Sequence, residues 1–485
     1  MLTLEEIKRF ISEDKTSKKK RQAKEGLRYY ESEHDILNYK VYYINADGNL
    51  EEDKSKTNMK IPHSFFGEIV DQKTQYMLSK RDGFIKSKIP ELQEELDKYF
   101  DDEFTDEIED LLTYGSVEGA SYLYNYKNEE DRLAFKFTEM LNLIEVDKKE
   151  ASDNKNHIIH YYADKIRSVG KKKDKEIIKI QVWDEDYTYY YVMADNQVTA
   201  DSEYKMNPRP HILYNVKGKQ YYDTFGYIPF FKFSNNKNEI SDLKPIKALI
   251  DDYDLMACGL SNNIQDLSEG YYVVKGFDGD NLDELSYNVK NKKIVGVSED
   301  GDLDIKTVAI PYDARKQKME LDEKNIYRFG MAFNSSQIGD GNITNIVIKS
   351  RYALLDLKCN KCENNLRALL KKVVKVVLDE INERNETAYT IRDIYFDFER
   401  EVMTNASDNA QIKKTEAETK QIEVNTLLNI ATYLPNEELI KNLCDVMDID
   451  YSEIEDEIKQ KLEEDKIDLN EASDKLINEK TPLAI

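Results

Sequence analysis

The stretch that organises this chain is GYIPFFKFSNN at residues 226–236, followed by LKPIKALIDDYD at residues 243–254. The three phenylalanines of the first stretch are frequent in β-strands, so they predict a strand. Asn235 and Asn236 suit a turn, because asparagine tolerates left-handed backbone angles and caps its own chain. Pro245 fits the first turn of a helix. Together the two stretches predict a strand, a polar turn and then a long amphipathic helix.

The composition describes a folded chain with a heavily charged exterior. Its 485 residues predict about two to four structural units, and 40% of them are hydrophobic while 34% are charged. The formal net charge is −25. Such an acidic balance argues against a protein that grips nucleic acid over a broad face, because phosphate contacts need lysine and arginine. The acidic balance does not exclude a channel through which nucleic acid slides without binding tightly.

The four cysteines are too few for a disulfide framework in a chain of this length, and a reducing compartment is the simpler interpretation. They are Cys258, Cys359, Cys362 and Cys444. The first residues show no basic segment followed by an apolar one, so we expect no signal peptide. No apolar run reaches the roughly 18 residues of a membrane span. We therefore expect an intracellular protein when it is made, with no membrane partner.

Hydrophobic periodicity predicts helices in the first part of the chain and then a sheet. Residues 1–30 are expected to be helical, a second helix opens at Pro62, and residues 91–113 form a third. Alternating patterns then predict strands, which suggests an antiparallel sheet packed on helices and an α+β fold. These strands are expected at 135–137, 143–146, 157–162, 177–183 and 187–193.

The second half of the chain is expected to be dominated by long helices. Helices are predicted at 246–269, 312–330 and 346–384, with short strands at 271–310 and a polar, glycine-dotted loop at 332–345. The helix at 346–384 would span on the order of 55–60 Å if straight, and a kink is expected in so long a helix. A strand is predicted at 395–398. Charged helices follow, and the last fifteen residues are expected to be disordered.

Three clusters resemble metal or redox sites, and each has a simpler structural interpretation. Cys359-x-x-Cys362 lies in the middle of a predicted helix without a second cysteine pair, whereas a redox motif would open a helix after a strand. His157-x-x-His160 lies on a strand pattern, where a spacing of three puts the two rings on opposite faces. The acids at 251, 252 and 254 are expected to face solvent on their helix.

No catalytic motif emerges from the remaining acids and glycines. Asp397-Phe-Glu399 puts two acids on one strand face, as some nucleases do, but no lysine or histidine motif accompanies them. The nucleotide-binding pattern Gly-x-x-x-x-Gly-Lys-Ser/Thr is absent from the sequence. Gly339-Asp-Gly-Asn342 resembles a phosphate cradle only weakly, because it lacks a strand before it and a lysine after it. We expect no catalysis and no cofactor.

An ordered series of segments between about residues 23 and 400 resembles the portal proteins of tailed phages and prophages of Gram-positive bacteria. Residues 405–485 show no clear match, and NITNI at 342–346 stands where that family often carries small residues such as Ser-Gly. The segments that carry the resemblance are Gly26-x-x-Tyr29-Tyr30, His34-Asp-Ile36, Ile69-Val-Asp71, Gly115–Tyr124, Ile228-Pro229 with Asn235-Asn236, Leu249-Ile-Asp251 with Asp254, and the long helix after 345.

The resemblance implies a portal fold and a ring, usually of twelve subunits, at one vertex of the capsid. The ring would be the channel for packaging and ejecting DNA, and ATP would be hydrolysed by the terminase. The implied parts are an α/β wing at 1–244, a stem helix at 245–270, a β-rich clip at 271–310, a second stem helix at 311–331, a tunnel loop at 332–345, the rest of the wing with its long kinked helix at 346–404, a helical crown at 405–470 and a disordered tail at 471–485.

The resemblance also implies partners and contact residues. The partners would be other copies of the chain, the terminase large subunit, a head-completion adaptor, scaffold, the major capsid protein and double-stranded DNA; the location would be the virion, and the host cytoplasm during assembly. Phe333 and Ile338 are expected to anchor the tunnel loop between subunits. Candidate residues facing DNA are Lys316, Lys318, Lys324, Arg328, Asn334, Ser335, Ser336, Gln337 and Lys349. Candidate docking residues of the clip are Asp278, Asp280, Glu299 and Asp300.

Two alternatives stay open at this point. One is another structural virion protein, such as an adaptor or a minor head protein, which the β insertion between two helices and the long helix disfavour. The other is a metal-dependent nuclease that uses scattered acids, which the lack of a convergent histidine, lysine and acid motif disfavours.

Overall fold

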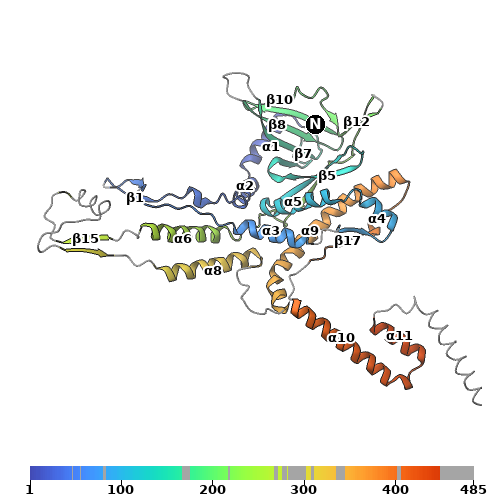
Figure 1. Ribbon diagram of the computed structural model, residues 1–485. Coiled ribbons are helices and arrows are strands. Elements are labelled where there is room, and N and C mark those ends of the chain that lie inside the picture. Colours follow the sequence, from blue (N-terminus) through green and yellow to red (C-terminus); the bar gives the residue numbers. More distant parts are fainter. Residues whose placement is uncertain are drawn as a thin grey trace, which may run out of the picture. The chain divides into compact units, whose positions relative to one another are not determined.

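The computed structural model describes all residues except 46, 55, 80–82, 167–174, 217–218, 267–270, 276–280, 282–301, 307–310, 335–344, 401–405 and 448–485. The chain divides into two compact units. The first comprises Met1–Gly339 and Arg351–Val402, and the second comprises Asp340–Ser350 and Met403–Ile485. The first unit combines helices with antiparallel strands (Figure 1), which confirms the expected α+β class.

Two helices occupy the N-terminus, where one was predicted. α1 (Leu4–Thr16) starts with a capping box between Thr3 and Glu6. Ser17 has extended backbone angles, ends α1 and caps α2 (Lys18–Tyr30) by accepting a hydrogen bond from the Lys20 amide. The prediction of a single helix over 1–30 is therefore wrong at Ser17. A serine hydroxyl that caps a new helix competes with continuation of the preceding one. The short 3₁₀ helix η1 (Asp35–Asn38) follows.

The larger sheet is antiparallel and has the strand order β10-β9-β8-β7-β6, with β11 paired to β9. α1 lies against this sheet through Ile7, Phe10 and Ile11, which share one core with Ile159 and Ile180. The predicted strands of this region are confirmed. They are β6 (Leu143–Val146), β7 (His157–Ile166), β8 (Lys175–Trp183) and β9 (Tyr187–Ala194), and the 3₁₀ helix η2 (Met140–Asn142) precedes them. The sheet also contains β10 (Gln197–Ala200) and β11 (Arg209–Pro210), which were not predicted.

A second sheet contains the strand predicted at 226–236. Its order is β14-β4-β5, with β14 (Phe230–Ser234), β4 (Ala120–Lys127) and β5 (Leu133–Glu139). α5 (Asp102–Glu118) packs beside β4 and β5 and ends at Gly119, whose φ of 99° is left-handed and suits glycine.

The single helix predicted at 91–113 is wrong. The structure has α4 (Pro90–Leu96) and then α5, because the Asp101 side chain accepts a hydrogen bond from the Phe104 amide and so caps a new helix. α3 (Phe65–Met77) begins three residues after Pro62, which was predicted to open it.

Short two-stranded pairs complete the sheet structure described. β1 (Tyr42–Ile44) pairs with β2 (Leu50–Glu52), and β12 (Ile212–Val216) pairs with β13 (Lys219–Asp223). β3 (Ile85–Ser87) pairs with β17 (Ile394–Phe396), the strand predicted at 395–398, which follows the 3₁₀ helix η5 (Ile391–Asp393).

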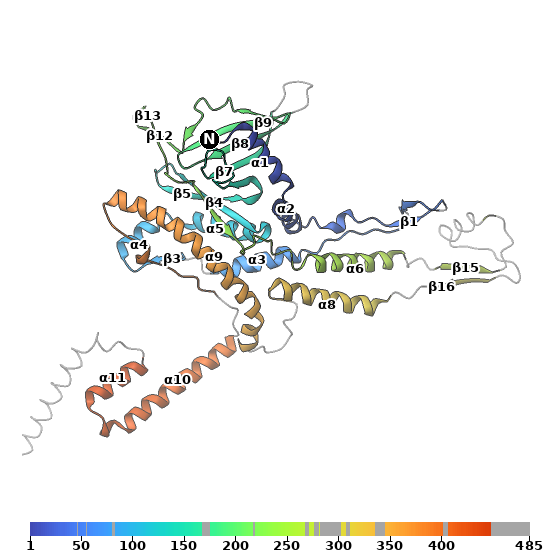
Figure 2. The ribbon, with the colours of Figure 1, turned by 180° about the vertical axis from the view of Figure 1, so that it is seen from behind.

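α6 (Lys247–Asp266) and α8 (Tyr312–Gly330) lie side by side (Figures 1 and 2). Between them in the sequence, β15 (Tyr271–Lys275) pairs with β16 (Asp302–Lys306) in antiparallel register. These elements match the helix, strand and helix order predicted from residue 246 to residue 330.

α9 (Asn345–Asn385) is 41 residues long and changes direction partway, as expected of so long a helix (Figure 2). Its face with Leu366, Leu370 and Val373 is buried with Leu96 and Ile108 in the largest core of the first unit. In the second unit, α10 (Ala406–Asn429) is followed by the 3₁₀ helix η6 (Ala431–Tyr433) and by α11 (Asn436–Val446).

Candidate functional site

The contact between α6 and α8 has an ionic centre. The ammonium of Lys318 on α8 pairs with Asp252 of α6 and with Asp322 of its own helix. Asp322 is 2% exposed, so this carboxylate depends on Lys318 for compensation. Lys318, one of the candidate DNA contacts, therefore joins the two helices.

The face of α8 away from this contact carries the cations that are available to a ligand. Lys316, Lys324 and Arg328 are exposed, while Ile326 and Tyr327 are buried toward α3 and α6. Lys324 and Arg328 are four residues apart and so lie one above the other on one helix face. Lys316 lies 3.9 Å from Glu320 in an exposed pair, which contributes little and leaves the lysine free to exchange partners.

The start of the predicted tunnel loop is tied to its own subunit. Phe333 stacks on Tyr352 of α9 with ring centroids 4.6 Å apart. Its amide donates to Gln72 Oε1 at 3.1 Å, and its carbonyl accepts from Gln72 Nε2 at 2.9 Å. These contacts hold Phe333 against α3 and α9 of its own chain, and its role as an anchor between subunits stays a prediction. Asn334 donates to Glu323 at 3.1 Å.

Of the remaining candidate residues, Lys349 is described and is exposed near the start of α9. The others lie outside the described part of the chain. The undescribed candidates are Ser335, Ser336, Gln337 and Ile338 of the predicted tunnel loop, and Asp278, Asp280, Glu299 and Asp300 of the predicted clip.

An extended segment, residues 57–63, runs antiparallel along α6 and is here called the strap. The amide of every second strap residue donates to a side chain of every fourth residue of α6. This spacing matches because two extended residues and four helical residues both rise by about 6–7 Å. The four pairs are Thr57 with Asp266 at 3.2 Å, Met59 with Asn262 at 2.7 Å, Ile61 with Cys258 at 3.2 Å and His63 with Asp254 at 3.0 Å.

Asp254 is the buried end of this ladder. Its carboxylate oxygens lie 2.7 Å from Nδ1 of His34 and 2.7 Å from Nδ1 of His63, and its exposure is 0%. Burial alone would raise the pKa of Asp254, but the hydrogen bonds from the two histidines outweigh it and hold the pKa below its usual value. The expectation that this acid faces solvent is wrong.

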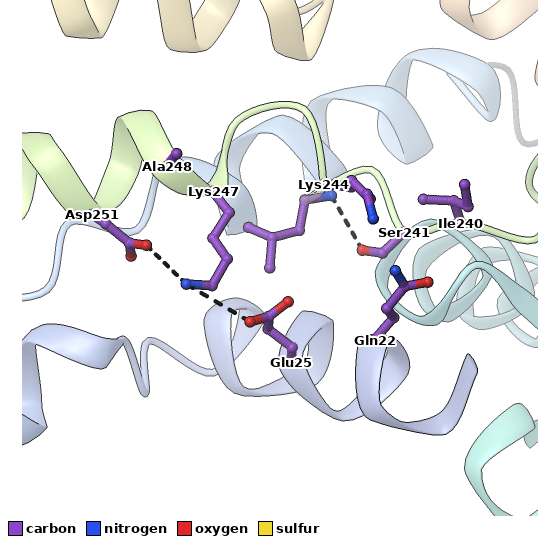
Figure 3. Close-up of a pocket in the computed structure, with 9 residues that line it drawn as sticks. Gln22, Glu25, Ile240, Ser241, Lys244, Lys247, Ala248 and Asp251 are labelled. Carbon is purple, nitrogen blue, oxygen red and sulfur yellow. Dashed lines mark hydrogen bonds and ion pairs between the residues drawn. The ribbon is translucent and has the colours of Figure 1, made fainter. Parts of the chain in front are cut away.

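The neighbouring acid, Asp251, belongs to a shallow pocket between α2 and α6. Figure 3 shows the Lys247 side chain between Asp251 and Glu25. The lysine lies 2.8 Å from Asp251 and 2.7 Å from Asp35. Desolvation lowers the pKa of Lys247, yet hydrogen bonds to Asp251 and Asp35 raise it above its usual value. Because the Lys247 ammonium in this pocket is already paired with acids, the pocket does not resemble an anion site.

The turn at Asn235 and Asn236 is fastened to the helices by a buried charge cluster. Lys73 of α3 is 2% exposed and donates to Ser116, Asn235 and Asp242 at 2.7–3.0 Å. Lys358 of α9 approaches the same Asp242 at 3.0 Å. Burial would raise the pKa of Asp242, but the two lysines hold it well below its usual range. The feature of the sequence that could have predicted this cluster is Lys73, a lysine on the apolar face of α3 four residues after Ile69.

The clusters that resembled chemical sites are parts of cores. Cys359 and Cys362 are buried in α9, and burial raises the pKa of Cys359 to about 12, which favours the inert thiol. His157 Nε2 lies 3.0 Å from Asp153, and His160 lies beside Gln181. Within the described residues, no group of three or more histidine, cysteine, aspartate or glutamate side chains could hold a metal ion. No described helix is long and apolar enough to cross a membrane.

Comparison with known proteins identifies relatives along nearly the whole chain. The family described as phage portal protein, SPP1 Gp6-like, matches residues 9–468. The portal protein of Bacillus phage SPP1 is 31% identical over 348 residues, which cover 71% of this chain and 67% of that protein. The portal protein of Clostridium phage phiCD119 is 25% identical over 486 residues, which cover 98% of each chain.

These matches confirm the resemblance and exclude both alternatives, the adaptor or minor head protein and the nuclease. The chain belongs to the SPP1 Gp6-like family of phage portal proteins, non-enzymatic virion proteins that form oligomeric rings and provide the channel for DNA packaging and ejection at a capsid vertex.

Proposed function

We propose that twelve copies of this chain form the ring and that α6 and α8 are its stem. The β15–β16 pair and the residues between these strands form the clip. Residues 332–345 form the tunnel loop, 1–244 and 346–404 the wing, and 405–470 the crown. The order of helix, strand pair and helix from 247 to 330 supports this division.

The exposed face of α8 lines the channel in this proposal. The observation that carries it is the division of cations on α8: Lys318 is engaged between the helices, whereas Lys324 and Arg328 are exposed on the face opposite α6. Cations in a strongly acidic protein guide phosphates without holding them, since each contact to DNA is weak and sensitive to salt. Contacts to phosphates carry no sequence preference, which a general conduit requires.

The partners follow from the same division of the chain. The clip docks the terminase large subunit on one occasion and the head-completion adaptor on another, through strand edges and the acids Asp278, Asp280, Glu299 and Asp300. Scaffold and the major capsid protein contact the outside of the ring, and double-stranded DNA passes through it.

The test neutralises the proposed lining. The double variant Lys324→Gln/Arg328→Gln should still form rings by native mass spectrometry, since neither side chain is buried. Packaging of DNA into prohead shells should slow several-fold, and the rate should depend less on salt concentration. Lys371→Gln/Lys375→Gln is the matched control, because it removes two exposed lysines with the same spacing from α9.

Two results would overturn the proposal. Rings of the α8 variant that package at the wild-type rate with the wild-type salt dependence would exclude this face as the lining. A wild-type protein that stays monomeric with scaffold and capsid protein present would exclude the ring itself.

A further inference from the structure

The β1–β2 hairpin has a largely apolar face that is exposed among the described residues of its own subunit. The register pairs Tyr42 with Glu52, Tyr43 with Glu51 and Ile44 with Leu50. Residues opposite each other in an antiparallel pair lie on the same face, so Tyr42, Ile44 and Leu50 share one face. Their exposed fractions are 50%, 71% and 67%. Glu52, opposite Tyr42, lies at the far end of this face and pairs with Lys40 at 3.0 Å.

The other face of the hairpin is polar. Tyr43 donates to Glu51 at 3.0 Å, and Asn45 donates to the same carboxylate at 2.8 Å. A two-stranded hairpin is marginally stable in water by itself. The apolar face is therefore expected to be covered in the working assembly.

The strap fixes where this hairpin lies. Thr57, which follows the hairpin, is bonded to Asp266 at the C-terminal end of α6, and His63 is bonded to Asp254 three turns earlier. The strap and α8 both run along α6 (Figure 1). The hairpin is thus held at the end of α6 that leads into β15.

α6 presents three different faces along this length. One bonds the strap through Asp254, Cys258, Asn262 and Asp266. A second meets α8, where Asp252 pairs with Lys318 and Gly259 lies against Arg315. The third consists of Ala257, Leu260 and Ile264, with Ile264 55% exposed. At 100° per residue the three faces are separated by about 90–150° around the helix.

The third face, called here the apolar stripe, is out of reach of the subunit's own hairpin. The strap holds that hairpin on a side of α6 about 150° away from the stripe. The subunit therefore has two apolar surfaces, the hairpin face and the stripe, that it does not cover with the strap or with α8.

We propose that the hairpin face of each subunit packs on the apolar stripe of α6 in the next subunit of the ring. A cyclic ring needs two different complementary surfaces on each subunit, and this pair supplies them. Neighbouring subunits of a ring are related by rotation about the ring axis, so a given residue lies at the same height along the axis in every subunit. The hairpin face and the apolar stripe both lie near the β15 end of α6, so the two surfaces of neighbouring subunits lie at similar heights. The inference rests on the proposed stem role of α6, and its occupant is a second copy of this chain.

Cross-linking between chains tests the pairing. Ile44→Cys and Ile264→Cys are made in separate chains, mixed before assembly and oxidised; the four native cysteines are buried. A disulfide-linked dimer of the two variants is expected. With both substitutions in one chain, a series of multimers up to the full ring is expected. Tyr43→Cys with Ile264→Cys is the control, since Tyr43 lies on the polar face, and it should cross-link at least tenfold less.

A second variant tests the energetic role. Ile44→Asp/Leu50→Asp should raise the protein concentration needed for ring formation at least tenfold, measured by native mass spectrometry. Asn49→Asp adds a carboxylate to the same hairpin away from the apolar face and should leave that concentration unchanged.

The outcomes separate this inference from the proposed function. If wild-type rings form but the disulfide links residues of one chain only, the proposed pairing is wrong. The pairing is also wrong if Tyr43→Cys cross-links to Ile264→Cys as efficiently as Ile44→Cys does. If Ile44→Asp/Leu50→Asp rings form normally but enter capsids poorly, the hairpin contacts the capsid shell and the inference is overturned. If wild-type rings never form, the proposed function fails first.

Discussion

Nδ1 of His34 lies 2.7 Å from a carboxylate oxygen of Asp254, although the two residues are 220 positions apart in the sequence. His63 reaches the other oxygen of the same carboxylate. One acid on α6 thus fixes the segment after α2 and the strap before α3. This contact joins the N-terminal part of the chain to the helix that we propose as the stem.

Replacing Asp254 should loosen the strap. Asp254→Ala removes the acceptor for both histidine rings and for the His63 amide, so we expect a loss of about 2–4 kcal/mol in the free energy of unfolding. Hydrogen exchange of the amides of residues 57–63 should also accelerate. Asp266→Ala is the control, because this acid is exposed and accepts one strap amide. Equal effects of the two substitutions would contradict a special role for the buried carboxylate.

Glu118 should make stability fall as pH rises. It is 1% exposed, and burial together with nearby Glu139 raises its pKa to about 8. The native state therefore binds this proton more tightly than the unfolded state does. The resulting stability is complete below about pH 4.5 and is lost as pH approaches 8.

Glu118→Gln stays neutral, so its melting temperature should vary less between pH 5 and 8. At pH 8 to 9 the variant should exceed the wild type by on the order of a few kcal/mol. Glu94→Gln on the exposed side of α4 should leave the pH profile unchanged. A wild-type profile in Glu118→Gln would show that the carboxyl is not buried in its protonated form.

Gly26 is required for the packing of α2 on α5. A Cβ atom at this position would overlap the carbonyl oxygen of Val117, which is backbone and cannot turn away. We expect Gly26→Ala to lower the melting temperature strongly or to prevent folding. Gly67→Ala is the matched control in α3, where the nearest atom would be 3.6 Å away. It should be neutral or stabilising by up to about 1 kcal/mol, and thermal denaturation of both variants checks the difference.

The buried charge cluster predicts a ranking of variants. Asp242→Ala leaves the ammonium groups of both Lys73 and Lys358 without their carboxylate. Lys73→Met removes one ammonium group and leaves Asp242 paired with Lys358. We expect Asp242→Ala to cost about 3–5 kcal/mol and Lys73→Met to cost less, as measured by denaturant unfolding. The reverse order would mean that Lys73, and not Asp242, holds the cluster together.

Local sequence patterns were sufficient for most elements of the fold. Hydrophobic periodicity located α6, α8 and the strands from β6 to β9, because the alternation of apolar residues reflects the face that each element buries. It failed at Ser17 and Asp101, where a capping side chain divided a helix that the apolar pattern continued across. The candidate cations of α8 were found by residue type alone, which could not separate Lys318 from Lys324.

The sequence by itself determined the α+β class, the order of strand, turn and long helices, and the family. Only the tertiary structure decided which of the three acids at 251, 252 and 254 is buried. All three occupy the same helix with the same charge, so local pattern treats them alike. What distinguishes Asp254 is the pair of histidines that reach it from 191 and 220 positions away. A buried carboxylate is tolerated only where such distant partners compensate its lost hydration, and no local pattern contains them.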